Sequence, residues 1–214
     1  LKLGKYAKAF IVHDDELLPH FSQELKPYIV PLRIEPERFT PEYPDPAKGK
    51  VTIVHAPSNR GVKGTKYIHS AVENLKKKYN IEYILVENMT QNEAFKEYQK
   101  ADIIVDQILG GSYGVFSIEA MAMGKPVITY ITDEMIKTFP DELPIVSASP
   151  LNIQEEIEKL INDGQIRHDL GVKGRKYIET YHDCKKNAKV IAKIYEGTAN
   201  KTKGKDAFEE VKAL

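Results

Sequence analysis

Three glycines, Gly110, Gly111 and Gly114, follow an apolar run that is typical of a buried strand. Glycine lets the backbone turn tightly and lets a ligand come close to the main chain. A helix is expected to open over 113–116, and the unpaired N–H groups at the start of a helix attract phosphate oxygens. The glycine turn therefore predicts an anion site, with ligand contacts expected from Gly110, Gly111, Ser112, Tyr113, Gly114 and Val115.

A second loop, over 56–64, carries the basic residues Arg60 and Lys63 and also follows an apolar, β-branched run. Ligands of open parallel sheets bind beyond the carboxyl ends of the strands, so we expect this loop and the glycine turn to face each other. Two cations on one side and backbone N–H groups on the other would enclose a diphosphate. The alternative is that both basic side chains are merely solvated.

Glu119 lies about one turn into the helix that follows the glycine turn, among Ile118, Ala120, Met121, Ala122 and Met123. A carboxylate in such apolar surroundings needs a partner, because burial of an unpaired charge is costly. That partner is either a group inside the fold or a ligand.

The run from Gly114 to Ile128 resembles the donor-binding segment of the retaining glycosyltransferases with the GT-B fold (group 1, family 4 type). Their pattern is Glu-Gly-Phe-Gly, four residues, then Glu-Ala-Met-Ala-x-Gly-x-Pro-Val-Ile, and the match from Glu119 onward is nearly complete. Two positions depart from it: the first Glu of the family falls on Gly111, and the Phe falls on Tyr113. In the family, that first Glu lies near the transferred sugar.

The resemblance implies a role for each matching residue. Glu119 would accept hydrogen bonds from the ribose of a nucleoside diphosphate sugar. Lys63, in a Lys-Gly pair as in the family, and Arg60 would be the catalytic residues, stabilising the charge on the leaving nucleoside diphosphate. Arg60 precedes Lys63 by two intervening residues rather than the family's four. The resemblance also implies no metal ion and no cofactor beyond the donor substrate.

Other polar residues near the same strand ends have two interpretations. Asp106 and Gln107 either contact sugar hydroxyls in place of the missing Glu or fix the glycine turn by bonding to its backbone. Asn88 lies where the family recognises the base, mostly through main chain. Tyr113 alternatively packs in the core, and His55 is more readily a hydrogen-bonded structural residue than a ligand. The remaining histidines have no metal-binding spacing.

The order of the expected elements gives the fold class. Strands expected over 49–55, 81–86, 103–106, 126–130 and 144–148 alternate with helices, which predicts an α/β fold with a Rossmann-like parallel sheet flanked by helices. By resemblance, this is the C-terminal half of a GT-B fold.

Four segments are expected along the chain. Residues 1–32 are a remnant of a preceding domain or inter-domain elements, and the proline-rich residues 33–50 are a linker. Residues 51–195 form the nucleotide-sugar-binding domain, which includes amphipathic helices over 170–181 and 187–195 and a helix capped by Asn152. Residues 196–214 are a tail that loses periodicity, expected to be disordered apart from a helical turn from Ala207.

Composition excludes several classes of function. Lys plus Arg equals Asp plus Glu at 31 each, so no net basic field favours a nucleic-acid partner. No apolar stretch reaches the roughly 20 residues of a membrane span. The single cysteine, Cys184, excludes an intramolecular disulfide and fits a reducing cytoplasm.

The chain begins at Leu1 in a strand-like segment, and we expect an amino-terminal, acceptor-binding domain to be missing. The favoured function is the donor-binding part of a glycosyltransferase that transfers a sugar with retention, inactive as a fragment alone. Gly111 in place of the family's Glu argues for an alternative, a nucleotide-sugar binding module without turnover. A nucleotide-sugar 2-epimerase, which shares the architecture, is a third.

Overall fold

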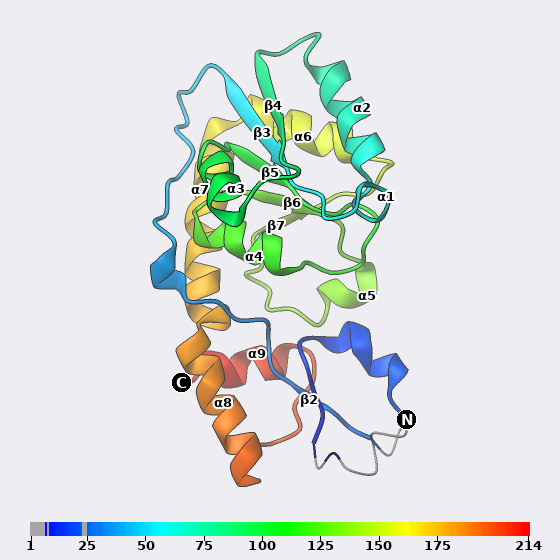
Figure 1. The fold of residues 1–214 in the computed structure, drawn as a ribbon, viewed down its shortest axis with the longest axis vertical. Helices are drawn as coiled ribbons and strands as arrows, with labels where there is room; N and C mark the ends of the chain where they lie inside the picture. The colour runs from blue at the N-terminus through cyan, green and yellow to red at the C-terminus, as the bar shows by residue number, and fades with distance from the viewer. Residues whose placement is uncertain (1–6, 8, 23–24) are drawn as a thin grey trace.

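The computed structural model describes residues 7, 9–22 and 25–214. Its larger part is a five-stranded parallel sheet with the strand order β4-β3-β5-β6-β7 (Figure 1). The strands are β3 (Val51–His55), β4 (Ile81–Leu85), β5 (Ile103–Val105), β6 (Val127–Thr129) and β7 (Ile145–Ser147). The predicted α/β fold with a parallel sheet is confirmed.

The central strands are apolar because both faces of the sheet are covered. Every residue of β3, β5 and β6 is buried, as expected for a parallel sheet between two helical layers. One core contains side chains of α2 (Thr65–Leu75) and α6 (Ile153–Asn162). The core on the other face contains side chains of α3 (Gln91–Gln99), α4 (Val115–Ala122) and α7 (Gly164–Tyr177).

The strand order reverses beside β3. The chain passes from β3 to β4 on one side and then crosses to β5 on the other, where His55 pairs with Val105. A crevice opens at such a reversal, outside the carboxyl ends of the two strands. The loops after β3 and β5 therefore lie at the position where ligands bind to sheets of this kind.

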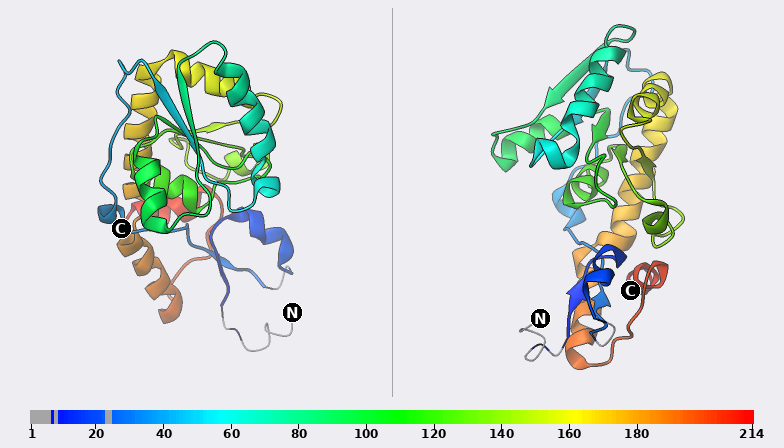
Figure 2. Two further views of the ribbon diagram at one scale, coloured as in Figure 1. Left: turned by 45° about the horizontal axis from the view of Figure 1, so that its top comes forward. Right: turned by 90° about the vertical axis from the view of Figure 1, so that its right-hand side faces the viewer.

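A smaller lobe lies below the sheet (Figures 1 and 2). Its strands β1 (Ile11–Val12) and β2 (Tyr28–Ile29) pair in parallel, and η2 (Asp15–His20) lies between them in the chain. The helices α8 (Cys184–Glu196) and α9 (Lys205–Lys212) complete it, with Val30, Val190, Ile194 and Val211 in one apolar cluster. The two ends of the described chain thus pack together.

The helical turn expected from Ala207 is present, but it starts two residues earlier and is a longer helix, α9 (Lys205–Lys212), of eight residues. Phe208 is only 1% exposed and packs edge-on against Phe139, with the ring centroids 5.7 Å apart. Ala207 and Val211 are also buried. A helix of this length offers too few apolar positions for its period to be recognised without knowing what it packs against.

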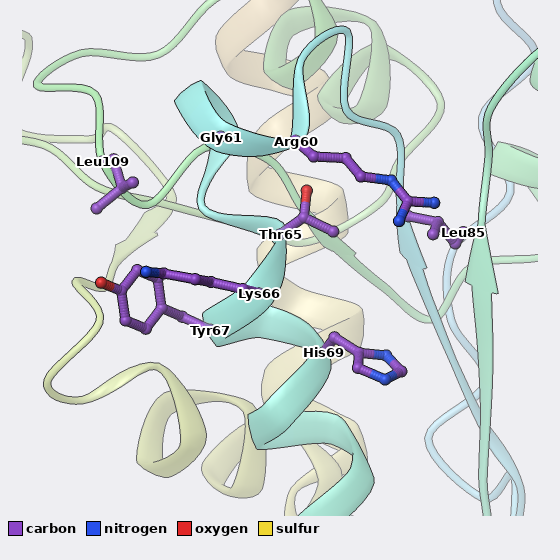
Figure 3. A pocket seen from close by; sticks show the side chains of 8 residues that line it. All are labelled: Arg60, Gly61, Thr65, Lys66, Tyr67, His69, Leu85 and Leu109. Atoms are coloured by element: carbon purple, nitrogen blue, oxygen red, sulfur yellow. The ribbon is translucent and has the colours of Figure 1, made fainter.

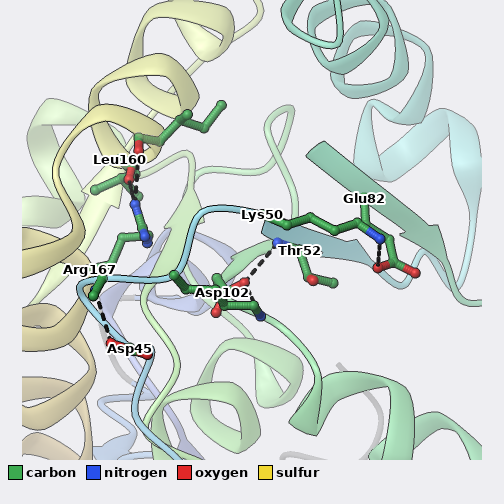
Figure 4. Close-up of polar contacts among 10 residues, drawn as sticks. Asp45, Lys50, Thr52, Glu82, Asp102, Leu160 and Arg167 are labelled. Carbon is green, nitrogen blue, oxygen red and sulfur yellow. Dashed lines mark hydrogen bonds and ion pairs between the residues drawn. The ribbon is translucent and has the colours of Figure 1, made fainter. Parts of the chain in front are cut away.

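The segment 33–50 contains one short helical turn, η3 (Pro36–Arg38), and otherwise no regular element, as predicted for a linker. Residues of this linker nevertheless form ion pairs and hydrogen bonds with the parallel-sheet domain. Near its end Lys48 forms an ion pair of 2.5 Å with buried Asp102, whose carboxylate also accepts a hydrogen bond from the Thr52 N–H at 2.8 Å (Figure 4). Arg175 donates to the carbonyls of Pro36, Phe39 and Ala122.

Two helix boundaries differ from the sequence prediction. The helix α7 begins at Gly164, six residues before the expected start, because Asp163 caps it by accepting from the Ile166 N–H. It continues into a π-helical turn, η4 (Ile178–His182), and α8 begins at Cys184 with Asp183 as its cap. Asn152 precedes α6 as expected, but its side chain accepts from the Ser149 N–H instead of capping the helix.

Candidate functional site

The loops after β3 and β5 face each other, as the sequence predicted. Asn59 accepts hydrogen bonds from the N–H groups of Gly61 and Val62 and so starts the short helix α1 (Arg60–Lys63). Gly64 ends α1 with a φ of 77°, a conformation that favours glycine. The Ile108 N–H then donates to the Lys63 carbonyl at 3.2 Å, which joins the two loops directly.

Lys63 and Asp106 form an ion pair at the base of the crevice. The Lys63 Nζ lies 2.6 Å from Asp106 Oδ1, and the Ser117 hydroxyl donates to Asp106 Oδ2 at 2.7 Å. Asp106 is only 1% exposed, so both of its oxygens are occupied inside the protein. The carboxylate orients Lys63 and joins the loop to α4, and the expected contact of Asp106 with sugar hydroxyls stays a prediction.

Gln107 fixes the glycine turn, which was the second of its two predicted roles. Its side-chain amide donates to the Ser112 carbonyl at 2.6 Å. A Cβ at Gly110 would lie 2.7 Å from that amide nitrogen, so Gly110 provides space for the bond. Among the described glycines, positive φ occurs at 64, 124, 197 and 204 and not in the turn, so the turn uses glycine for close approach and not for left-handed backbone.

The side chains of Ser112 and Tyr113 point into the protein, as the alternative of a packing role for Tyr113 predicted, and a ligand contact through their backbone stays a prediction. The Ser112 hydroxyl donates to Asp14 Oδ2 at 3.1 Å, and both residues are buried. The Tyr113 hydroxyl lies 3.1 Å from His182 Nε2 and 3.3 Å from the Tyr177 hydroxyl. The turn is enclosed by the amino-terminal segment and η4, so these two side chains pack while the backbone of the turn remains at the crevice.

The start of α4 retains the features of an anion site. Gly114 precedes the helix and has no side chain to cap it, so the N–H groups of the first turn have no capping partner in the described part of the chain. Val115, the first helical residue, is exposed. A Cβ at Gly114 would meet nothing within 4 Å, which leaves this end of α4 open.

Glu119 lies in an open cavity of about 480 Å³ and not in the sealed interior. The cavity is formed by α3, α4 and the linker, and its lining includes Arg33, Arg38, Phe39 and Gln91. Within residues 7, 9–22 and 25–214, the Glu119 carboxylate has no hydrogen-bond or ion-pair partner closer than 4 Å. Burial raises the pKa of Glu119, and no counter-charge offsets the cost.

Arg60 lies apart from the glycine turn, contrary to the expected enclosure of a diphosphate by both basic residues. Its guanidinium pairs with the carboxylate of Glu87, which follows β4, through two hydrogen bonds, one of them 2.7 Å long. Figure 3 shows the side chain extending toward Leu85, with Leu109 on the opposite side of a cavity of about 580 Å³. Arg60 thus pairs with a carboxylate after β4, whereas Lys63 contacts the loop after β5 through Asp106 and Ile108.

The loop after β4 presents Asn88 to solvent with a φ of 55°, which asparagine tolerates better than most residues. The side chain is exposed, and the expected role of Asn88 in base recognition stays a prediction.

His55 is structural: its ring nitrogens lie 2.8 Å from the Val105 carbonyl and 2.8 Å from the Thr65 hydroxyl. Burial lowers the pKa of His55, so the ring is neutral near pH 7.

Asp14 and Ser117 are the contacts that sequence reasoning missed. Asp14 lies 98 positions from the serine it binds, and Ser117 was treated as one more residue of α4. The position of Ser117 three residues after Gly114, on the first turn of α4, was the available signal for a side chain facing the crevice. Asp14 is recognisable locally only as a helix cap, a role it has by accepting from the Glu16 N–H before η2, and no local pattern marks its contact with Ser112.

Residues 50–177, more than half of the chain, match the family model described as glycosyl transferases group 1. The chain belongs to this family. None of the curated protein sequences matches it. In the part of this glycosyltransferase-family chain that the structure describes, no helix has the length and apolar character needed to cross a membrane.

Solved structures show the same fold at low sequence identity. Sucrose-phosphate synthase from Thermosynechococcus elongatus is 18% identical, with a TM-score of 0.69 over 89% of this chain and 58% of that protein. HepE from Anabaena, in complex with UDP, is 11% identical, with a TM-score of 0.69 over 91% and 65%. The C-terminal domain of LpcC from Francisella tularensis is 20% identical, with a TM-score of 0.51 over 71% and 99%. This family member thus has the GT-B type of fold and spans 58% of the first of these proteins.

Proposed function

We propose that this chain binds a nucleoside diphosphate sugar and is the donor-binding part of a glycosyltransferase that transfers the sugar with retention. The acceptor would be held by an amino-terminal domain. The diphosphate would lie at the first turn of α4, where uncapped N–H groups and the positive end of the helix dipole favour an anion.

Lys63 would neutralise the same phosphates. Its side chain is 14% exposed and is held by Asp106, which is itself fixed by Ser117. As the glycosidic bond breaks, negative charge builds on the leaving diphosphate, and a cation fixed beforehand stabilises that charge without reorganising. Arg60 pairs with Glu87 after β4, whereas Lys63 pairs with Asp106 in the loop that leads to α4, so we assign the electrostatic role first to Lys63 and the α4 amides.

Glu119 carries the proposal, because its carboxylate has no partner in the described part of the chain although burial raises its pKa. Two ribose hydroxyls would satisfy its oxygens. The presence of UDP in the HepE structure makes UDP the first nucleotide to test. We expect the nucleotide to bind without a metal ion, and titrations with Mg²⁺ and with EDTA check this.

Replacing Glu119 by Gln should weaken UDP binding about tenfold, because hydrogen bonds to a charged group contribute roughly 1.5–3 kcal/mol. Calorimetric titration measures the affinity. The thermal midpoint should stay within about 1 °C of the parent, and the exposed residue Glu196, replaced by Gln, is the matched control.

Binding to the parent should also weaken as the pH falls through the raised pKa of Glu119, and this dependence should vanish in Glu119→Gln. An unchanged affinity would count against the ribose contact.

A binding module without turnover is the second candidate, and Gly111 is the observation that favours it. A Cβ at this position would lie 3.2 Å from the Thr132 side chain, so no larger residue fits without a shift of its neighbour. Incubating the protein, together with its amino-terminal domain, with labelled nucleotide sugars separates the candidates. Sugar transfer or release supports the transferase, isomerisation supports an epimerase, and tight binding with an unchanged nucleotide sugar supports the module.

A further inference from the structure

A separate cavity of about 590 Å³ lies on the far side of the glycine turn, between the loop 141–144, α7, η4 and α9. Leu143, Pro144 and Leu170 give it apolar walls, and the rings of Tyr177 and Tyr181 complete them. Its lining shares no residue with the cavity at Glu119. It has the size and mostly apolar walls of a site for a small molecule.

The charges around this cavity do not balance. The Lys212 amine lies 3.0 Å from a Glu142 oxygen, and Asp141 forms an ion pair with Lys205, so these charges are neutralised. Lys173 and Lys176 also line the cavity, and neither has a carboxylate within 4.0 Å among the described residues. Lys212 also pairs with Glu209 at 3.5 Å, so the local charges sum to one excess positive charge, which favours a ligand that carries a negative charge.

The backbone at the cavity is irregular. η4 is a π-helical turn of five residues that interrupts the helical path from α7 to α8. π-helical turns occur often at functional sites, because they change which side chains face a given surface. Here the irregularity follows Tyr177 and includes Tyr181, whose hydroxyl donates to Glu142 at 2.8 Å.

We propose that this cavity binds a small organic anion with an aromatic body, the anionic group at Lys173 and Lys176 and the ring among Leu143, Leu170 and the tyrosines. The site does not depend on the nucleotide site. It is nevertheless connected to it: the Tyr177 hydroxyl lies 3.3 Å from that of Tyr113, and the Phe139 ring, at 4.8 Å from the Tyr113 ring, packs on the same side chain. A ligand that displaces Tyr177 therefore changes the surroundings of the glycine turn.

Phenyl phosphate is the probe, titrated into isotopically labelled protein and followed by NMR. We expect saturable shifts of the Leu143 and Leu170 methyl signals and a shift of the Tyr113 amide signal. Inorganic phosphate, which lacks the ring, and benzyl alcohol, which lacks the charge, should each bind at least fivefold more weakly. Binding of inorganic phosphate as tightly as phenyl phosphate would contradict the aromatic part of the proposal.

Variants at the two lysines test the charge. Both lysines are exposed, so the double variant Lys173→Ala/Lys176→Ala should fold, and it should bind phenyl phosphate at least tenfold more weakly. Lys173→Arg/Lys176→Arg retains the charges and should bind within about threefold of the parent. The absence of saturable binding, or equal affinity in the alanine and arginine variants, would overturn the proposal. Because no nucleotide is present, either result is independent of the proposed donor site.

Discussion

Asp106 is central at the scale of single residues, because its carboxylate is buried yet charged. It receives the Lys63 ammonium on one oxygen and the Ser117 hydroxyl on the other. Burying a charge costs free energy unless it is paired and hydrogen-bonded, and here both conditions hold. The same contacts hold Lys63 beside the start of α4, so stability and the proposed phosphate contact depend on one ion pair.

Replacing Asp106 by Asn should lower the free energy of unfolding by about 3 kcal/mol, because it leaves the Lys63 ammonium without its counter-charge. Urea denaturation measures the loss. Lys63→Met combined with Asp106→Asn should recover part of it, since no unpaired charge then remains, and Asp133→Asn on the exposed start of α5 (Asp133–Ile136) is the control. A loss well below about 1 kcal/mol would show that solvent reaches the pair.

His182 gives the protein a pH dependence. Its ring lies buried between the Leu32 carbonyl and the Tyr113 hydroxyl, and burial lowers the pKa of His182 to about 4. The folded state therefore holds the ring neutral while the unfolded chain takes up a proton below its usual pKa of about 6.5. The stability due to this group is complete above pH 6.5 and is lost as the pH falls toward 4.

We expect the free energy of unfolding to fall by about 3 kcal/mol through this group between pH 7 and pH 4. Urea denaturation at a series of pH values measures the slope. His182→Gln, which cannot take up a proton, should be less stable at pH 7 but should lose less on acidification. His55 contributes in the same direction and is present in both proteins, so the difference isolates His182. Equal slopes would refute the assignment.

At the scale of elements, the approach of α7 to the end of α4 depends on Gly171. A Cβ at this position would lie 2.2 Å from the Gly124 carbonyl oxygen, a backbone atom that cannot rotate away. Gly124 itself has a φ of 73°, and a Cβ there would meet the Tyr43 ring at 2.7 Å. Helix, loop and linker are therefore packed backbone to backbone, and Met121 on α4 stays buried beneath them.

Gly171→Ala should lower the free energy of unfolding by about 2 kcal/mol, because the gain in helix propensity is outweighed by the displacement of α7. Gly61→Ala in α1 is the matched control, since the nearest atom to an added Cβ would be Asn59 Oδ1, at 3.4 Å. It should be nearly neutral. Chemical denaturation compares the two variants, and a stabilised Gly171→Ala would mean that α7 lies farther from α4 than described.

At the scale of the whole molecule, the first and last elements that the structure describes pack against each other. Val12 and Ile29 of the small sheet share an apolar cluster with Ala207 of α9, and the Asp15 carboxylate accepts a hydrogen bond from the Gly204 N–H at 2.9 Å. Asp14 connects this lobe to the glycine turn through Ser112. The lobe therefore fixes one side of the candidate site.

Removing residues 198–214 should lower the thermal midpoint by several degrees, because loss of Phe208 uncovers Phe139 and Tyr181 and loss of Val211 uncovers Val30 and Val190. Roughly 1.5–3 kcal/mol is lost for each large apolar side chain. Differential scanning calorimetry measures the midpoint. In the intact protein the amides of 205–212 should exchange slowly with deuterium. Fast exchange there, with an unchanged midpoint after truncation, would restore the prediction of a disordered tail.

The sequence by itself determined the sheet, the covering helices and the position of the ligand crevice. Runs such as Val51–His55 are apolar at every position, and their alternation with helical periods admits few topologies other than a parallel sheet. Because the carboxyl ends of parallel strands share one edge, the meeting of the loops that carry Lys63 and Gly110 followed as well. These are consequences of local pattern and chain connectivity.

Only the tertiary structure decided which side chains face the crevice. The partner of Ser112 is 98 residues away and that of Tyr113 is 69 residues away, while Arg60 pairs with a carboxylate 27 positions further along. Such contacts depend on how whole elements pack, and packing depends on shape and desolvation summed over many distant residues. The backbone of the glycine turn could therefore be placed from the sequence, but the direction of its side chains could not.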